Sequence, residues 1–385
     1  MSIQLLPTEL LLQIFAYCNQ RSFKYDLFSI SLVCKQWHCI SRRQVDNTSL
    51  QELFYYGNHT PCQIERMCSL LEESRKLLLN DAHIIKSIRI HVCDDWFRNI
   101  HNQTYLSKIL SLAQNVKTLK IQFSDRWYLA ATKCEPPYNI LPPCYHTIEN
   151  LIVLKHTHRL VDDGLTDLVR SLPKLKWLDM CSTDQYPDLV LALADRDLHH
   201  VSIRESKFPE LHECIRNWSN LRSLSVRDLR NECHALFVQV AETCNHLTIL
   251  EFTRGCNSGG LHKQQEQDAI VQIVQRCILL KRVSLGGIDF QEYQTLEKIL
   301  YHGRALISLS LTQCTNISIP KEITESKIHN ICIMDCIHID YWFWNRILSA
   351  GMINILYNGI DVSEIENRGF TRYSGCSWRR NNFPI

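Results

Sequence analysis

A short pattern of apolar and variable positions recurs through most of the chain. It has the form apolar-x-x-apolar-x-apolar, as in IKSIRI ending at Ile90, LRSLSV ending at Val226 and LISLSL ending at Leu311. Alternating apolar residues place their side chains on one face of a β-strand, so each copy predicts a strand. Nine steps separate the middle apolar residues of ten copies, with a mean of 27 residues over the 243 positions between the first and the last. These residues are Ile88, Leu119, Leu151, Leu178, Val201, Leu224, Leu250, Val283, Leu309 and Ile331.

Helical periodicity fills several of the intervals between the predicted strands. Residues 162–175, 233–247 and 267–280 each carry apolar side chains three and four positions apart. Asp162 and Asp163 open the first of these segments, where we expect them to cap a helix rather than act as a catalytic pair. Strands that alternate with helices at a fixed period predict an α/β solenoid, with a parallel sheet on its inner side and helices outside.

A small polar residue or a cysteine often follows the predicted strand by three positions. Such side chains can satisfy backbone groups where the chain bends. With this position included, the repeat resembles the cysteine-containing leucine-rich repeats, most closely in LISLSLTQCTNI and IHNICIMDCIHI. The resemblance implies a leucine-rich-repeat horseshoe, in which Cys336 is a turn residue rather than a zinc ligand beside Cys332 and His338. The residues at this position are Cys93, Ser124, Thr183, Ser206, Cys314 and Cys336.

The first twenty residues are unusually apolar and predict a helix that begins near Pro7. Leu10, Ile14 and Phe15 recur at helical spacing, whereas Leu12 lies off that stripe, so the helix is apolar on more than one side. A secretion signal is not expected, because the first basic residue is Arg21 and polar residues interrupt the apolar run. The helix either caps the solenoid or keeps an apolar face for a partner chain.

The segments LPTELLLQIFAYC and DLFSISLVCKQWHCI resemble the F-box family over residues 5–45, including the proline, glutamate, cysteine and tryptophan positions. The resemblance implies a small all-α domain that docks on the Skp adaptor of SCF ubiquitin ligases and, through it, on a cullin. Pro7, Leu10 and Ile14 are the expected contacts, and Trp37 is expected to pack inside the domain. The full set of residues at adaptor-binding or packing positions is Leu6, Pro7, Glu9, Leu10, Ile14, Phe15, Leu32, Val33, Cys34 and Trp37.

These patterns divide the chain into four parts: an F-box at 1–45, a helical linker at 46–84, leucine-rich repeats at 85–350, and a degenerate last repeat with a cap at 351–385. The linker has helical periodicity from Cys62 to Leu79 and no Gly/Ser-rich tract, which favours a rigid connector. One more strand is expected near residues 353–356. Residues 125–147 contain two pairs of prolines and predict an extended loop, either functional or simply tolerated.

Composition excludes several classes of function. The 385 residues carry a net charge of +2, which gives no electrostatic sign of a nucleic-acid partner, and no stretch predicts a membrane span. The 18 cysteines include no Cys-x-x-Cys pair, so we expect reduced, buried thiols in the cytoplasm or nucleus, with no metal or other cofactor. No nucleophile–base grouping or phosphate-binding loop is apparent, so we do not expect an enzyme.

The combined motifs resemble a substrate-recognition subunit of an SCF-type E3 ubiquitin ligase; the alternative is an interaction scaffold outside ubiquitination. The target would bind the concave sheet, where Arg204 and Arg227 are expected about 5 Å apart on adjacent strands. We hypothesise that they bind an acidic or phosphorylated segment. The favoured alternative is a solvated face, with the arginines paired to neighbours such as Asp179 or Glu205. The candidate target-binding residues are Trp177, Asp179, His200, Arg204, Arg227 and Arg282.

Overall fold

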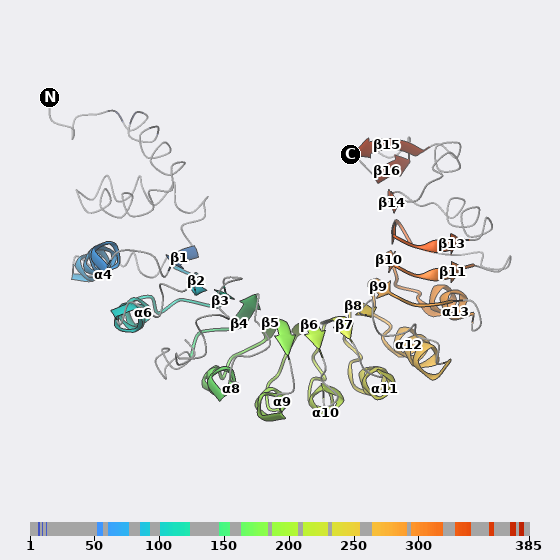
Figure 1. Cartoon of the computed structure of the whole chain (residues 1–385), viewed down its shortest axis with the longest axis horizontal. Helices are drawn as coiled ribbons and strands as arrows, with labels where there is room; N and C mark the ends of the chain where they lie inside the picture. The colour runs from blue at the N-terminus through green and yellow to red at the C-terminus, as the bar shows by residue number, and fades with distance from the viewer. Residues whose placement is uncertain are drawn as a thin grey trace. The chain divides into compact units, whose positions relative to one another are not determined.

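The computed structural model (Figure 1) describes most of the repeat region, two residues of the N-terminal helix and Pro7 before it. Contacts divide the chain into two compact units, Met1–Leu175 and Lys176–Ile385. All statements below concern the described residues, which are 7, 10, 13, 52–56, 61–76, 85–92, 101–123, 146–154, 163–183, 187–206, 211–229, 233–254, 264–290, 294–318, 328–339, 354–357, 370–374 and 377–380.

The first unit contains four parallel strands in chain order. They are β1 (Glu52–Tyr56), β2 (Ser87–Val92), β3 (Thr118–Phe123) and β4 (Asn150–Leu154). Its helices are α4 (Pro61–Lys76), α6 (His101–Leu112) and α8 (Asp163–Ser171), and α4 packs against α6.

Residues 46–84, predicted as a helical linker, contain a strand as well as a helix. The expected helix is α4, but β1 precedes it and pairs with β2 in parallel, with Leu53 opposite Ile88. The sheet of the first unit therefore begins one strand before the predicted array. The sequence does carry a signal, since Leu50, Leu53 and Tyr55 have the repeat spacing, but Leu53 stands 35 residues before Ile88.

The second unit repeats the strand–helix plan and has an antiparallel end. Its parallel strands are β5 (Trp177–Thr183), β6 (His200–Ser206), β7 (Ser223–Leu229), β8 (Ile249–Arg254), β9 (Arg282–Gly286), β10 (Ser308–Thr312), β12 (Asn330–Met334) and β14 (Asn354–Tyr357). β14 confirms the strand predicted near 353–356. β16 (Ser377–Arg380) pairs with it antiparallel, and β15 (Phe370–Ser374) pairs with β16.

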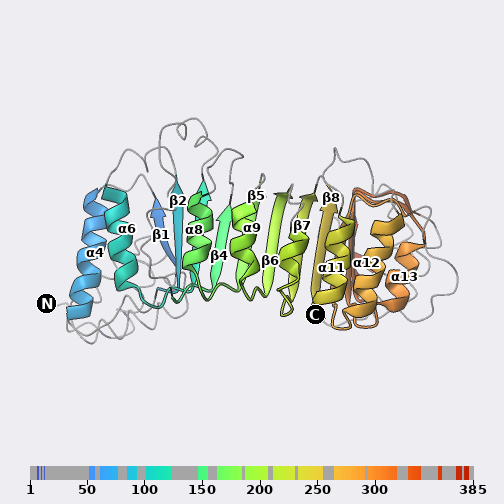
Figure 2. The ribbon, with the colours of Figure 1, turned by 90° about the horizontal axis from the view of Figure 1, so that it is seen from below.

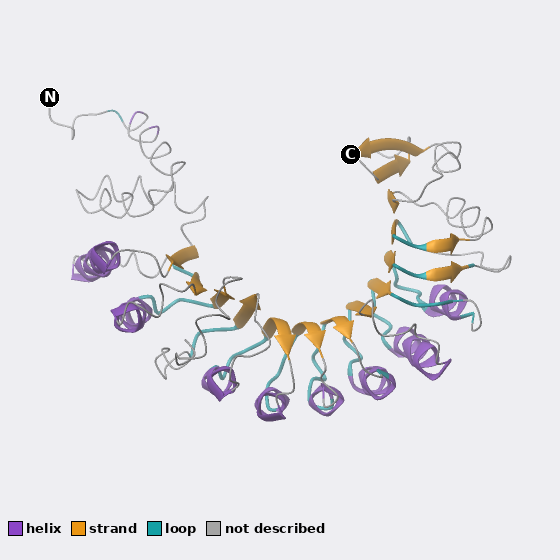
Figure 3. Ribbon diagram, in the orientation of Figure 1, coloured by secondary structure: helices purple, strands orange, loops and turns teal. Residues whose placement is uncertain are grey.

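The helices of the second unit cover one side of its sheet, which makes the fold α/β. They are α9 (Pro187–Ala194), α10 (Leu211–Ile215), α11 (His234–Thr243), α12 (Gln264–Arg276) and α13 (Thr295–His302). Figure 2 shows α11, α12 and α13 side by side, and they pack in that order. In Figure 3 these helices lie on the outer side of β8 to β10, which leaves the other face of the strands uncovered by helices.

The core lies between the strands and the helices, at the positions that the periodicity marked. All ten middle residues of the predicted strands, from Ile88 to Ile331, are at most 2% exposed. Burial alternates along the strands, as in β10, where Leu309 and Leu311 are buried and their neighbours are not. Strand positions between these buried residues form rows across the opposite face, because parallel pairing keeps the same register from strand to strand.

The turn after the strand behaves as predicted in the two described repeats that have a cysteine at this position. The Cys314 thiol lies 3.5 Å from the carbonyl oxygens of Leu285 and Thr312, and the Cys336 thiol lies 3.4 Å from those of Leu311 and Met334. β11 (Thr315–Ile317) and β13 (Ile337–Ile339) follow these turns and pair with each other. Thr183 and Ser206 end β5 and β6, and Cys93 and Ser124 lie outside the described residues.

The Cys314 and Cys336 thiols contact each other across neighbouring repeats. Their mutual hydrogen bond, together with burial, raises the pKa of Cys314 well above its usual value. Both thiols act as turn residues, and no described cluster of three or more His, Cys, Asp and Glu side chains could hold a metal ion. None of the described helices has the length and apolar character needed to cross a bilayer.

Candidate functional site

Two of the predicted adaptor-binding residues are described, and both are exposed. Pro7 precedes a helical segment that includes Leu10 and Gln13, and the Leu10 N–H donates to the Pro7 carbonyl at 3.1 Å. This bond closes a first helical turn at Pro7, as its missing N–H and fixed φ favour. The side chain of Leu10 is 45% exposed. The residues outside the described part of the chain are Leu6, Glu9, Ile14, Phe15, Leu32, Val33, Cys34 and Trp37.

On the second unit, strands β5 to β8 bring most of the predicted target-binding residues together on the uncovered face of the sheet. Trp177 lies opposite His200, and Arg204 lies opposite Arg227, so these residues form rows across adjacent strands. Between these rows runs a third, which contains Asp179, Ser202, Ser225 and Glu251.

Trp177 and His200 form one edge of this group. Their rings stack with centroids 3.6 Å apart and planes inclined by 18°. Burial lowers the pKa of His200, although the carboxylates of Asp179 and Glu251 act in the opposite direction. The imidazole is therefore mainly neutral near pH 7, and it forms with the partly exposed indole a flat aromatic surface.

Arg227 is paired within the protein. Its guanidinium donates to Glu251 at 2.5 Å, and the Ser225 hydroxyl donates to the same carboxylate oxygen at 2.9 Å. Burial alone would raise the pKa of Glu251, but the hydrogen bonds from Arg227 and Ser225 and the Arg227 charge hold it below its usual value. Arg227 thus matches the predicted alternative of a paired arginine, although its partner is Glu251 rather than Asp179.

A β-bulge in β7 accompanies this pair. Val226 lies opposite Phe252, whereas the next paired residue, Leu229, lies opposite Arg254, so β7 contains one extra residue. Asp228 takes up the bulge with a φ of 58°, a left-handed conformation that aspartate tolerates, and its N–H donates to Thr253. Bulges change the direction of nearby side chains, and this one lies beside Arg227.

Arg204 differs from Arg227. The Nε atom of Arg204 is buried and has no hydrogen-bond partner within the described part of the chain, and the same holds for Oδ1 of Asp179. A buried donor without a partner is costly. Since Arg227 is already paired with Glu251, Arg204 is the arginine of this group that remains a candidate for binding an anionic group.

Arg282 does not join this group. It lies opposite Ile249 and Ser308, in the row that contains His200 and Ser223. Three strand spacings, about 14 Å, separate its strand from that of His200. The structure thus gathers Trp177, Asp179, His200, Arg204 and Arg227 and leaves Arg282 apart. Glu251, whose pairing with Arg227 was not predicted, is the additional member of the site.

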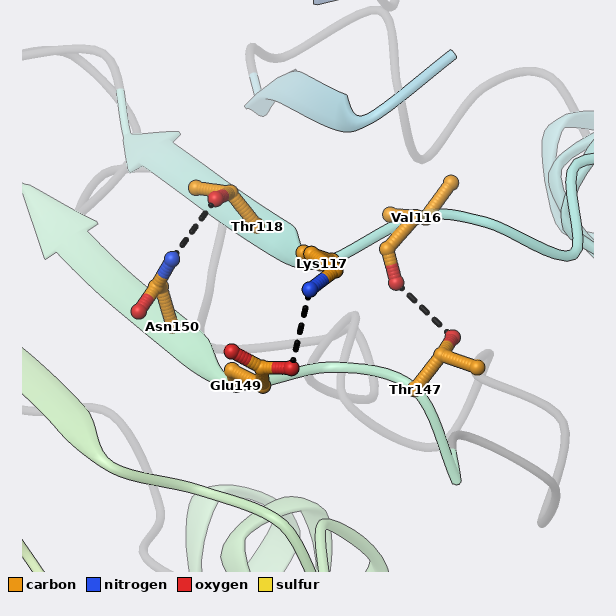
Figure 4. A network of polar contacts seen from close by, with 6 residues as sticks. All are labelled: Val116, Lys117, Thr118, Thr147, Glu149 and Asn150. Atoms are coloured by element: carbon orange, nitrogen blue, oxygen red, sulfur yellow. Dashed lines mark hydrogen bonds and ion pairs between the residues drawn. The ribbon is translucent and has the colours of Figure 1, made fainter. Parts of the chain in front are cut away.

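Polar contacts at the start of β3 and β4 (Figure 4) have a structural role. Thr147 donates to the Val116 carbonyl at 2.8 Å, and Asn150 donates to the Thr118 hydroxyl at 3.0 Å. Lys117 and Glu149 form an ion pair at 3.2 Å, with side chains 59% and 36% exposed. An exposed pair contributes about 0–1 kcal/mol, so this network joins neighbouring repeats without forming a binding site.

A model of the F-box-like family matches residues 3–45, which include the motif that contains Pro7 and Leu10. No curated protein matched the chain. The chain therefore contains an F-box-like domain at residues 3–45, and each of its two units has an α/β fold with parallel strands.

Proposed function

We propose that this protein is the substrate-recognition subunit of an SCF-type E3 ubiquitin ligase. The observation that carries the proposal is the F-box-like match at residues 3–45, because F-box domains generally bind the Skp adaptor. In this proposal the adaptor links the chain to a cullin, and the repeats bind the target. The protein would act in the cytoplasm or nucleus, where ubiquitin ligases of this class work.

Exposure of Leu10 supports an adaptor contact at the F-box. About forty residues bury too little surface to be comfortably stable alone, so a partner that covers their remaining apolar surface adds stability. Leu10 is a large apolar side chain that is nearly half exposed in the isolated chain. Helix packing against such a residue is a common mode of recognition.

The repeats support a leucine-rich-repeat horseshoe of the cysteine-containing type. Three features favour this assignment: the mean spacing of 27 residues, the parallel strands with buried middle residues, and the turn cysteines Cys314 and Cys336. The uncovered face of β5 to β8, with its aromatic pair and Arg204, is our candidate for the target-binding surface.

The chain itself performs no chemistry in this proposal. It holds a target lysine near the conjugating enzyme that the cullin recruits, which raises the effective concentration of the two reacting groups. Catalytic power then comes from proximity, and specificity comes from the repeat surface.

Affinity purification of the full-length protein tests the proposed function. With the proteasome and cullin activation blocked, we expect the Skp adaptor, a cullin and one or more targets in the same eluate. The alternative function, an interaction scaffold outside ubiquitination, would instead give bound proteins with neither adaptor nor cullin, and that result would contradict our proposal.

Charge reversal at Arg204 tests the target-binding surface. We expect Arg204→Glu to reduce recovery of the target at least tenfold, because a charge-assisted hydrogen bond to an acidic or phosphorylated segment is replaced by repulsion. Quantitative mass spectrometry of the eluates measures the change, and adaptor recovery should stay constant. Arg282→Glu is the matched control, because its strand lies three strand spacings, about 14 Å, from the strand of Arg204. Equal target recovery from both variants would refute the role of Arg204.

A further inference from the structure

The turn between each outer helix and the next strand has the same geometry in six described repeats. Each turn has four residues, and the backbone N–H of the fourth donates to the carbonyl of the first at 2.9 to 3.4 Å. The two central residues of such a turn extend into solvent, so the fold places no apolar requirement on them. The six turns are 113–116, 172–175, 218–221, 244–247, 277–280 and 303–306.

One of these turns has two large aliphatic residues at its centre. Ile278 is 74% exposed and Leu279 is 44% exposed. The other five central pairs are Gln114–Asn115, Pro173–Lys174, Ser219–Asn220, Asn245–His246 and Arg304–Ala305. Because polar or small residues form the same turn elsewhere, folding does not explain Ile278 and Leu279.

A hollow lies directly beside this turn. Its volume is about 230 Å³, and it is lined by two segments, at the end of α12 and at the end of α13. The lining residues are Val274, Gln275, Cys277, Ile278 and Leu280 from the first segment and residues 302–305 from the second. Ile278 forms part of the wall, and Arg304 lies on the opposite segment. Tyr301 and Ile307 flank that segment in the sequence and are 72% and 36% exposed. The two adjacent repeats therefore combine an apolar surface with a cavity large enough for one or two side chains.

The two segments that line the hollow carry charges of one sign. Residues 272–282 and 301–308 contain Arg276, Lys281, Arg282 and Arg304 and no aspartate or glutamate. Arg276 lies in the last turn of α12, where its charge offsets the negative end of the helix dipole. Lys281 and Arg304 remain as net positive charge on an exposed surface, whereas Arg282 belongs to the row on the uncovered face of the sheet.

We propose that the hollow between α12 and α13 is a second protein-binding site, distinct from the β5–β8 surface. Its occupant is a peptide segment of a partner protein that inserts a large apolar side chain beside Ile278 and places carboxylates against Lys281 and Arg304. Apolar burial supplies affinity, and the complementary charges orient the segment. This proposal does not depend on adaptor binding by the F-box.

Fluorescence anisotropy with the full-length protein tests the site. The probes are three labelled 12-residue peptides: one with a central Leu-Phe pair flanked by Asp and Glu, one with the same pair flanked by Lys, and one acidic peptide with Ser-Ser at the centre. We expect the first to bind at least tenfold more tightly than the other two. Its affinity should fall as salt is raised from 0.05 to about 0.15 M, where the screening length is about 8 Å.

Variants locate the binding. The double substitution Ile278→Asn with Leu279→His copies the natural turn at 245–246, so it preserves the fold while it removes the apolar surface. It should weaken binding of the acidic Leu-Phe peptide at least tenfold, and Arg304→Glu should have an effect of similar size. The matched controls are Leu191→Ser, which removes another exposed leucine, and Lys174→Glu, which reverses a cation in an equivalent turn.

Three outcomes would overturn the proposal. The first is equal binding of all three peptides, and the second is equal affinity of the turn variant and its controls. The third is a combination of two results: no peptide binds, and sedimentation shows concentration-dependent dimerisation of the wild type that the double substitution abolishes. The occupant of the hollow would then be a second copy of this chain. Circular dichroism spectra that match those of the wild type verify that each variant is folded.

Discussion

Deletion of residues 5–42 is expected to abolish co-purification of the Skp adaptor and the cullin while recovery of the target is unchanged. The F-box-like match covers this segment, and the target-binding surface that we propose lies on another unit of the chain. Immunoblotting of the eluates for adaptor, cullin and target measures the three effects separately. Recovery of the adaptor with the deletion variant would show that it binds elsewhere and would contradict the proposed docking mode.

A point substitution refines this test without removing a domain. Leu10→Asp places a charge at a side chain that is 45% exposed in the isolated chain, so we expect little effect on folding. In the complex the same carboxylate would be buried without a partner. We therefore expect a loss of about 2 kcal/mol or more in the free energy of adaptor binding, as is typical of a central apolar contact. That is roughly a thirtyfold loss of adaptor affinity. Gln13→Asp, which adds the same charge to an exposed position three residues along, is the control.

Replacement of Trp218 by alanine is expected to lower the free energy of unfolding by about 3–5 kcal/mol. Trp218 is fully buried, and its indole N–H donates to the Leu193 carbonyl at 3.1 Å. Its own carbonyl accepts the Leu221 N–H at 3.0 Å, and the Cys244 thiol contacts the same oxygen at 3.8 Å. The residue thus links the repeats of α9, α10 and α11. Its backbone carbonyl is kept in the variant, so the expected loss comes from the buried side chain and from its hydrogen bond to Leu193.

Two further variants separate packing from hydrogen bonding at this site. Trp218→Phe keeps most of the buried volume but leaves the Leu193 carbonyl without this donor, so we expect a loss of about 1–3 kcal/mol. Trp177→Ala removes a partly exposed tryptophan of the same unit and should cost clearly less than Trp218→Ala. Urea denaturation followed by far-UV circular dichroism is the measurement, because fluorescence would itself change. Equal midpoints for the two alanine variants would contradict the packing role of Trp218.

The strands were predictable because their signal is local. Val201 and Leu224 must be buried wherever their strands pair, since alternation fixes which side chains share a face before any partner is known. The same argument placed His200, Arg204 and Arg227 on the opposite face, and the register of β6 and β7 confirms that placement. β1 was missed because the helical periodicity of residues 62–79 led to the assignment of the whole of 46–84 as a linker, and Leu53 stands 35 residues before Ile88, further than any step of the recognised array.

The sequence alone therefore determined the period, the buried strand positions, the turn cysteines and the F-box motif, all of which depend on residues close together in the chain. Only the tertiary structure decided that Arg227 pairs with Glu251, that the Nε of Arg204 lacks a described partner, and that Ile278 lies beside a hollow shared with Arg304. Arg227 and Glu251 are 24 positions apart and lie beside a bulge, and Ile278 and Arg304 belong to separate repeats. Repeat periodicity carries no information on how side chains from separate repeats orient toward one another.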